Sequence, residues 1–199
     1  MTDLVWTDAL SAPRSLATRG DTAIAVIEDP GVVEIRPQAG MPGLERLYAH
    51  VLGVDLPAEP WSVAATDTFR VVWTGPRRWR LIGERSAVAE LLENMRRQSP
   101  ETALFDLTGG FVSFRIIGAT AQDILMRLCP LDLRAIAPDE ARGTSIAGVQ
   151  TLLIRESTPN SWLVLAPRSF ADHAAEALVE AARTPGRLGL FEPAEPPPV

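Results

Sequence analysis

The chain has 199 residues and a net charge of −6, with 46% hydrophobic and 22% charged residues. This composition is typical of one globular domain of moderate size or of two very small ones, and it excludes a disordered chain. All nineteen basic residues are arginine, which excludes Schiff-base chemistry on lysine, a lysine general base and a P-loop lysine. An acidic chain without a basic face is also a poor binder of nucleic acid.

The number of cysteines and the length of the apolar runs indicate the cellular compartment in which the protein is expected. A single cysteine permits no internal disulfide, and with only two histidines a Cys/His zinc site is not expected. No apolar run reaches the ~20 residues that a membrane-spanning helix needs. Residues 1–20 lack the basic start and apolar stretch of a signal peptide. We therefore expect a cytoplasmic protein.

The elements predicted for the first half follow an N-terminal arm, residues 1–20. In chain order they are strands 22–28 and 32–37, a helix with the apolar stripe Leu44, Leu47, Val51 and Leu52, strands 69–73 and 79–82, and a helix with the stripe Val88, Leu91, Leu92 and Met95. Asp29-Pro30-Gly31 and Gly75-Pro76 have the composition of tight turns. Each pair of strands is therefore expected to form a hairpin.

The second half repeats this order. Its predicted elements are strands 102–107 and 111–117, a helix with Ile124, Leu125 and Leu128, strands 149–155 and 162–166, and a helix with Ala174, Ala177, Leu178 and Ala181. Thr108-Gly109-Gly110 and Pro159-Asn160 supply the turns. Ser86 and Ser169 stand where the N-caps of the two long helices are expected.

Three sequence matches, in the same order in both halves, indicate an internal repeat. Trp79, Arg85 and Ser86 recur as Trp162, Arg168 and Ser169, segment 31–36 resembles 110–115, and segment 54–56 resembles 131–133. We predict an α+β domain made of a duplicated β-β-α-β-β-α unit, residues 21–97 and 101–183, with helices packed on a largely antiparallel sheet. Neither half would bury much core alone, so the two should share a sheet or a core.

The sequence contains no combination of acid, base and nucleophile that is typical of a catalytic site. Gly109-Gly110 precedes a strand rather than a helix, and no G-x-G-x-x-G is present. The segment 143–148 is one residue too long for a nucleophile elbow and also precedes a strand. His50 and His173 are expected at helix surfaces or boundaries, and Cys129, followed by Pro130, is expected to pack in the core. We assign no catalytic, cofactor-binding or metal-ligating residue to this chain.

Several polar residues have structural roles as their first interpretation. Asp106, which ends an apolar strand, is expected to accept a hydrogen bond in the turn that follows it, and Asp55 and Asp132 to do so in later turns. The arginines at 77, 78 and 80 form either a solvated hairpin tip or a site for an anionic partner. Arg85 and Arg168 are expected to hold carbonyl groups at strand ends.

The two ends of the chain differ from its middle. Residues 184–199 form a Pro-rich tail, and Met1–Gly20 has no clear hydrophobic period. One interpretation is two frayed ends. The other is that Trp6, Leu188, Leu190 and Phe191 dock on a partner, because apolar side chains gain little from staying in water.

Four motifs resemble one known family, the gamma subunits of heterotetrameric sarcosine oxidase. They are Thr74-Gly75-Pro76-Arg77-Arg78-Trp79, similar to its L-G-P-x-x-W hairpin; Asp106-Leu107-Thr108-Gly109-Gly110, similar to D-L-S-x-G; Gly118, Ala121 and Leu125 followed by Cys129-Pro130-Leu131-Asp132-Leu133, similar to G-x-x-A-x-x-x-L…C-P-L-D-L; and Pro167-Arg168-Ser169-Phe170, similar to V-P-R-S-[YF]. The resemblance covers about residues 31–183.

The resemblance implies a fold related to the tetrahydrofolate-binding domain of the glycine-cleavage aminomethyltransferase, itself an internal duplication. It also implies a small subunit packed beside large flavoprotein subunits that oxidatively demethylate sarcosine. In that family FAD, covalent FMN, NAD and the folate site belong to the larger subunits, and no catalytic residue is assigned to gamma. Related complexes oxidise other N-methyl amino acids, so the substrate stays open.

An alternative is a free-standing tetrahydrofolate-binding or one-carbon-transfer protein of the same fold. Asp106 or Glu34 would then contact the pterin. The K-G-C-Y-x-G-Q signature of folate-dependent iron–sulfur maintenance proteins is absent from this sequence.

Overall fold

The structure is a computed structural model that describes residues 15–19, 22–27, 30–37, 44–98 and 103–183. In the first half these form β1 (Ser15–Arg19), β2 (Thr22–Ile27), β3 (Gly31–Arg36), α1 (Leu44–Leu52), β4 (Val63–Ala65), β5 (Phe69–Gly75), β6 (Arg78–Gly83) and α2 (Arg85–Gln98). In the second half they form β7 (Ala103–Asp106), β8 (Phe111–Ile117), α3 (Ala121–Met126), β9 (Glu140–Ile146), β10 (Val149–Arg155), β11 (Ser161–Pro167) and α4 (Ala171–Arg183), with short 3-10 turns at Leu133–Ala135 and Arg168–Phe170.

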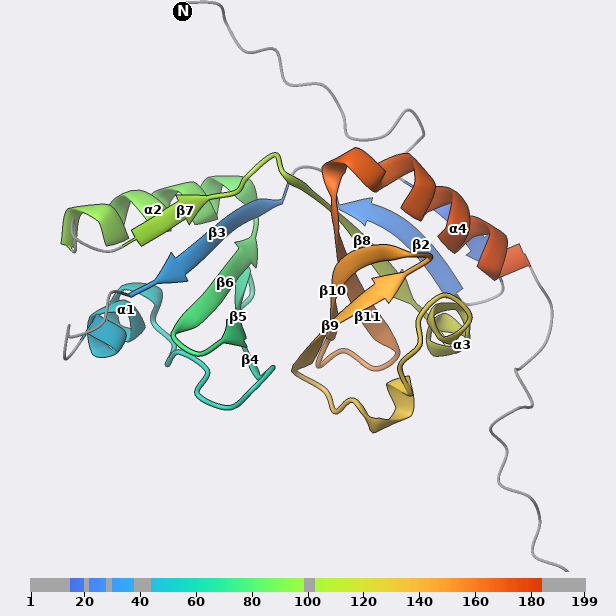
Figure 1. Ribbon diagram of the computed structural model, residues 1–199, viewed down its shortest axis with the longest axis horizontal. Helices are drawn as coiled ribbons and strands as arrows, with labels where there is room; N and C mark the ends of the chain where they lie inside the picture. Colours follow the sequence, from blue (N-terminus) through green and yellow to red (C-terminus); the bar gives the residue numbers. More distant parts are fainter. Residues whose placement is uncertain (1–14, 20–21, 28–29, 38–43, 99–102, 184–199) are drawn as a thin grey trace, which may run out of the picture.

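The strands form two antiparallel sheets rather than one. The six-stranded sheet has the order β1-β2-β8-β11-β10-β9, and the five-stranded sheet has the order β4-β5-β6-β3-β7. Figure 1 shows the sheets side by side, with α1 and α2 on the outer side of one and α3 and α4 on the outer side of the other. The predicted mixture of helices and antiparallel strands is confirmed.

The hairpins predicted at the start of each half are wrong. β2 pairs with β1 and β8, whereas β3 pairs with β6 and β7, so the chain passes from one sheet to the other between them. The same occurs between β7 and β8. A turn does form there, with the Gly110 amide donating to the Leu107 carbonyl at 2.9 Å. A local turn signal fixes a change of direction, but the partner of each strand depends on longer-range packing.

The two sheets nevertheless have matching strand orders. β4-β5-β6-β3-β7 corresponds, element by element along the chain, to β9-β10-β11-β8-β2, with β1 added at one edge. Two copies of one unit that exchange their first strands would give this arrangement. The order therefore agrees with the predicted duplication, which stays an inference from this order and the repeated motifs.

Three strands were not predicted: β1 and β4 in the first half and β9 in the second. β1 lies within residues 1–20, which were expected to form an arm, and it pairs with β2. β4 has three residues, and β9 contains Arg142, Gly143, Thr144 and Ser145, a run without apolar alternation. A two-residue turn, Ala147-Gly148, joins β9 to β10, with φ of 49° and 83° at its two positions. These angles match a type I′ hairpin turn. The glycine-bearing segment 143–148 is thus a strand followed by a hairpin turn.

Over the described ranges, the hydrophobic core has three parts. One lies under α3 and α4, and one lies under α1 and α2. The third lies between the sheets and draws Val32, Val72 and Ile82 from one sheet and Ala141, Leu152, Ile154, Leu163 and Leu165 from the other. Strand alternation produces this division, because neighbouring residues of a strand face opposite sides of its sheet. The prediction that the halves share a core is confirmed.

The helix starts differ from the predicted caps. α2 begins at Arg85, so Ser86 lies inside its first turn, where its hydroxyl donates to the Glu84 carboxylate. Ser169 lies in the 3-10 turn before α4. In both cases the helical backbone starts earlier than the serine signal suggests. Within the described ranges, no helix combines the length and apolar character needed to cross a membrane.

Gly83, where β6 ends, provides a test of the packing. A Cβ there would lie 2.5 Å from the Thr68 carbonyl oxygen and 2.8 Å from Phe69 Cα, both backbone atoms. We expect Gly83→Ala to destabilise the chain by about 1–3 kcal/mol because that backbone must shift. Urea unfolding measures the change.

Gly75→Ala is the matched control on the same hairpin, since the nearest atom to its Cβ would be 3.8 Å away. Its free energy of unfolding should stay within about 1 kcal/mol of the parent chain. Equal losses in the two variants would contradict the packing described for β6.

Candidate functional site

Two buried glutamates stand beside the core between the sheets, each among arginines. Glu34 on β3 has an exposed fraction of 5%, and Glu156, just after β10, has 6%. A buried carboxylate needs charged or hydrogen-bonding partners. The two surroundings differ, and these glutamates are the charged residues found buried in the part of the chain that the structure describes.

Glu34 lies among three guanidinium groups. Arg36 Nε donates to Glu34 Oε1, Arg80 Nη2 donates to Glu34 Oε2 at 3.0 Å, and Arg78 Nε lies 3.9 Å from Glu34 Oε1. The register explains the arrangement, because Glu34 pairs directly with Arg80 across β3 and β6. Alternation places Arg36 and Arg78 on the same face as Glu34.

The arginines keep Glu34 ionised. Burial acts to raise the pKa of Glu34, but hydrogen bonds from Arg80 and Arg36, together with their charges, outweigh it and hold that pKa below its ordinary value of 4.5. A carboxyl group with a lowered pKa is an anion at neutral pH and a poor proton donor. One carboxylate against three guanidiniums leaves this cluster with a net charge of +2.

Glu156 links the two sheets. Its carboxylate accepts from Arg70 of β5, from Arg115 Nε and Nη2 of β8 at 3.1 and 3.2 Å, and from the Ser161 hydroxyl. Arg70 belongs to the five-stranded sheet and Arg115 to the six-stranded sheet. Removing one partner of such a buried group leaves an uncompensated charge. This cluster therefore holds the two sheets in one relative position.

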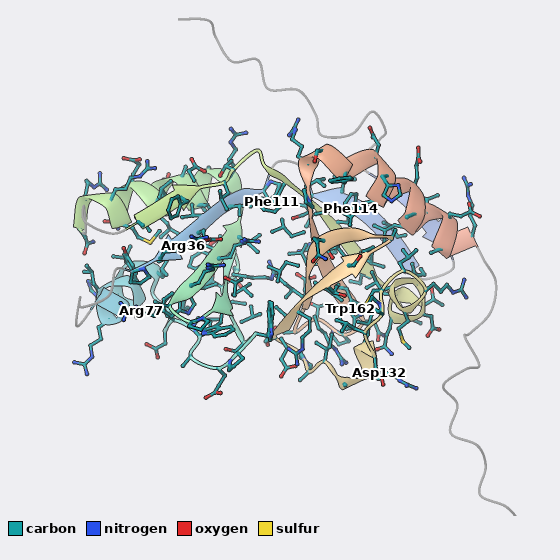
Figure 2. All side chains as sticks on the ribbon, viewed as in Figure 1. Arg36, Arg77, Phe111, Phe114, Asp132 and Trp162 are labelled. Carbon is teal, nitrogen blue, oxygen red and sulfur yellow. The ribbon has the colours of Figure 1, made fainter. Side chains whose placement is uncertain are left out.

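Each cluster borders a hollow. A hollow of about 360 Å³ is lined by Arg78, Arg80, Phe111 and Trp61, and no acidic side chain belongs to its wall. A larger one, about 1090 Å³, is lined by Arg70, Arg115 and the start of α2, and it also has Asp67 and Glu84 in its wall. Figure 2 shows Arg36 on the five-stranded sheet and Phe111 at the boundary between the two sheets.

Trp61 forms a rigid wall of the smaller hollow. Its φ is +65°, a value that bulky residues rarely adopt. Its carbonyl accepts from the Ala141 amide at 2.8 Å, and its ring stands edge-on to Trp73 with centroids 6.3 Å apart. A Cβ on Gly143 would lie 2.8 Å from the Trp61 ring. The glycine therefore allows the ring to lie directly on β9.

The turn roles predicted for two aspartates are confirmed. Asp106 Oδ1 accepts from the Thr108 amide at 2.9 Å. Asp132 Oδ1 accepts from the Arg134 amide at 3.1 Å and caps the 3-10 turn Leu133–Ala135. Side-chain hydrogen bonds from Arg134 are the main cause that lowers the pKa of Asp132. The corresponding role of Asp55 stays a prediction; Asp55 lines a hollow beside Arg46 and Arg77.

The other predicted residues are also placed by the fold. Trp79 is buried, and its Nε1 donates to the Pro57 carbonyl at 2.7 Å. Gly75 and Pro76 precede Arg77, whose φ is +55°, at the turn between β5 and β6. Arg168 lies with Ser169 in the second 3-10 turn, and its backbone amide donates to the Gly110 carbonyl at 2.9 Å. The predicted role of its guanidinium, like that of Arg85, stays untested.

Among the described residues, no hydrogen bond joins one nucleophile or base candidate to another. Cys129 is buried, and its sulfur accepts from the Leu131 amide at 3.4 Å and from the Thr144 hydroxyl at 3.8 Å; Pro130 follows it at the surface. His50 is exposed at the end of α1. His173 is exposed on α4, with Nε2 3.0 Å from the Ala147 carbonyl oxygen. Packing of Cys129 and the surface positions of both histidines are confirmed.

Over the residues that the structure describes, no group of three or more His, Cys, Asp and Glu side chains could hold a metal ion. The partner-contact candidates Trp6, Leu188, Leu190 and Phe191 lie outside the described residues.

Sequence reasoning missed both glutamate clusters. Glu34 interrupts an otherwise apolar strand, and Glu156 follows the apolar run of β10. This is the same signal that led to Asp106. It marks a carboxylate that needs partners, but the partners come from strands that the predicted hairpins did not bring together.

Comparison with known proteins identifies a family. The family described as "Sarcosine oxidase, gamma subunit family" matches residues 36–183, more than half of the chain. No curated protein matches the chain.

Two solved structures are similar to this one. A chain of the heterotetrameric sarcosine oxidase from Corynebacterium sp. U-96 is 27% identical, with a TM-score of 0.73 over 84% of this chain and 87% of that one. The glycine cleavage system aminomethyltransferase T from Bartonella henselae is 12% identical, with a TM-score of 0.62 over 81% of this chain and 46% of that one. The second likeness concerns the fold alone.

The negative charge of Glu34 should contribute to the free energy of unfolding of the chain. A carboxyl group whose pKa is lowered by folding adds stability above its unfolded pKa, and that stability is lost as the pH falls through the folded value. We expect Glu34→Gln to lower the free energy of unfolding by about 1–3 kcal/mol at pH 7. The difference from the parent chain should shrink as the pH falls below 4.5, where the unfolded carboxyl protonates.

Urea unfolding at several pH values measures this difference. Glu180→Gln serves as the control, because Glu180 is 73% exposed and its ion pair with Arg183 lies at the helix surface. It should change stability by less than about 0.5 kcal/mol at any pH. A Glu34→Gln loss that does not vary with pH would contradict the ionised state assigned to Glu34.

Proposed function

The chain belongs to the sarcosine oxidase gamma subunit family, and we propose that it acts as the non-catalytic gamma-type subunit of a complex that oxidatively demethylates sarcosine to glycine. The match over residues 36–183 carries the proposal. The likeness to a chain of a heterotetrameric sarcosine oxidase supports membership of a multi-subunit complex. The larger subunits of the complex are flavoproteins in this proposal and hold FAD, FMN, NAD and tetrahydrofolate.

The use of charged residues in this chain supports a structural role. Glu156 joins Arg70 and Arg115 from different sheets, and Glu34 is held as an anion by arginines. A general acid or base needs a pKa near the working pH and access to a substrate. These two carboxylates instead form ion pairs with neighbouring guanidinium groups. The reaction is therefore assigned to the partner subunits.

The folate-binding alternative receives no specific support from the contacts. Asp106 accepts the Thr108 amide within its own turn. Glu34 is occupied by Arg36 and Arg80. Glu34 is thus buried and already paired with arginines, and the likeness to the aminomethyltransferase extends to the fold only.

Purification of the tagged chain from the cells that make it tests this proposal. We expect the preparation to show flavin absorbance and sarcosine-dependent activity, because the chain should remain bound to the catalytic subunits. The same chain produced alone should be colourless, inactive with sarcosine and other N-methyl amino acids, and silent in calorimetric titration with tetrahydrofolate.

Strong demethylation by the isolated chain would contradict the non-catalytic role. Micromolar folate affinity, about −8 kcal/mol, would favour the alternative instead. Comparison of sarcosine with other N-methyl amino acids in the purified complex would identify the substrate.

A further inference from the structure

One exposed region of the molecule combines positive charge with aromatic rings. Phe105, on the edge strand β7, is 46% exposed, and Arg36 Cζ lies 5.3 Å from the centre of its ring. Arg80 Cζ lies 5.2 Å from the centre of the Phe111 ring. Glu34 connects these two pairs, since it accepts hydrogen bonds from both arginines. Arg36, Arg78, Arg80, Phe105 and Phe111 are called the arginine–aromatic patch below.

The patch is positive on a chain that is negative overall. Its three arginines face one carboxylate, Glu34, whereas the whole chain carries −6. Arg36 and Arg78 remain about half exposed, with side-chain exposures of 47% and 46%. Positive charge held in place by a buried glutamate, and still open to solvent, favours an acidic partner.

Arg78 has spare hydrogen-bonding capacity. In the part of the chain that the structure describes, its guanidinium makes only the 3.9 Å approach to Glu34. It lines the smaller hollow, whose wall contains no acidic side chain. A guanidinium has five donors in a fixed plane and binds a carboxylate through two of them at once. A carboxylate that entered this hollow would therefore form an ion pair with Arg78.

The hollow is preorganised. Trp61, with its left-handed backbone and its ring against Gly143, fixes one side, and Phe111 under Arg80 fixes another. A site that needs no reorganisation on binding loses less free energy to ordering. Arginine and aromatic residues are also the types enriched at the energetic centres of protein interfaces.

We propose that the arginine–aromatic patch is the surface through which this chain docks on a larger subunit of its complex, with a carboxylate of an acidic segment of that subunit bound to Arg78 in the hollow. The inference rests on the proposed function. An acidic protein segment fits better than a small free anion, because a small anion at Arg78 would leave Arg36 and Phe105 exposed. The chain's net charge of −6 argues against nucleic acid.

The experiment uses the full chain co-expressed with the larger subunits, and measures the affinity of assembly by titration and light scattering. Arg78→Glu should weaken assembly by about thirtyfold or more, as removal of a central interface residue does. Phe105→Ala should weaken it by about fivefold or more. Arg78→Lys should restore part of the affinity, and added salt should weaken the parent complex more than the Arg78→Glu complex.

Controls of matched exposure lie elsewhere on the molecule. Arg96→Glu changes the charge equally at a side chain 48% exposed on α2, and Ile117→Ala removes an apolar side chain 37% exposed at the end of β8. Both should assemble like the parent chain. Thermal unfolding of each isolated variant shows whether it folds, and Arg78→Glu should fold because Arg78 is half exposed.

The outcomes separate the two proposals. If the parent chain does not assemble, the proposed function fails. If it assembles and folded Arg78→Glu and Phe105→Ala assemble as well as the controls, the docking surface is wrong. If Arg78→Glu removes only self-association of the isolated chain and leaves complex assembly unchanged, the patch binds a second copy and the proposal is again overturned.

Discussion

The apolar layer between the two sheets is the constraint on which the rest of the structure depends. Each half is too small to bury both faces of its own sheet, so the inward faces cover one another through residues such as Val72, Leu152 and Leu163. Burying such a side chain contributes about 1.5–3 kcal/mol. Strand pairing also joins the two halves, because β2 pairs with β8 in one sheet and β7 pairs with β3 in the other. Glu156 then fixes their relative position through arginines from both.

Local periodicity was enough to predict most elements but not their partners. The stripes of α2 and α4 and the alternation of β5, β6, β10 and β11 follow from burial of one face, a property of neighbouring residues. The pairing of β2 with β8 joins segments that lie far apart in the sequence. β9 escaped prediction because Arg142 and Gly143 break its pattern. Gly143 is there because the Trp61 ring occupies the space of a side chain.

The site was harder to predict than the fold for a related reason. The turn aspartates Asp106 and Asp132 act within two residues along the chain, so their roles could be derived from sequence. Glu34 and Glu156 act through arginines on other strands, so their roles required the correct topology. Function was harder still. Its assignment rests on the family match, because the charged groups that converge here stabilise the chain and the proposed reaction lies in other subunits.

The two glutamate clusters also differ in a way that bears on assembly. With Trp79 and Trp162 as equivalents in the inferred repeat, the strand registers align Glu34 with Arg115, because Ile35 lies opposite Trp79 and Ile116 lies opposite Trp162. In the second half the buried carboxylate is Glu156, which follows β10 and pairs with Arg70 and Arg115. The first half keeps its carboxylate on β3 and gathers three arginines, two of them half exposed. The Glu156 cluster joins the sheets with two arginines around one carboxylate, whereas the Glu34 cluster gathers three arginines around one carboxylate and so has the larger excess of positive charge. Docking through the Glu34 cluster, as proposed above, would use this asymmetry, because two equivalent surfaces would offer two competing binding modes.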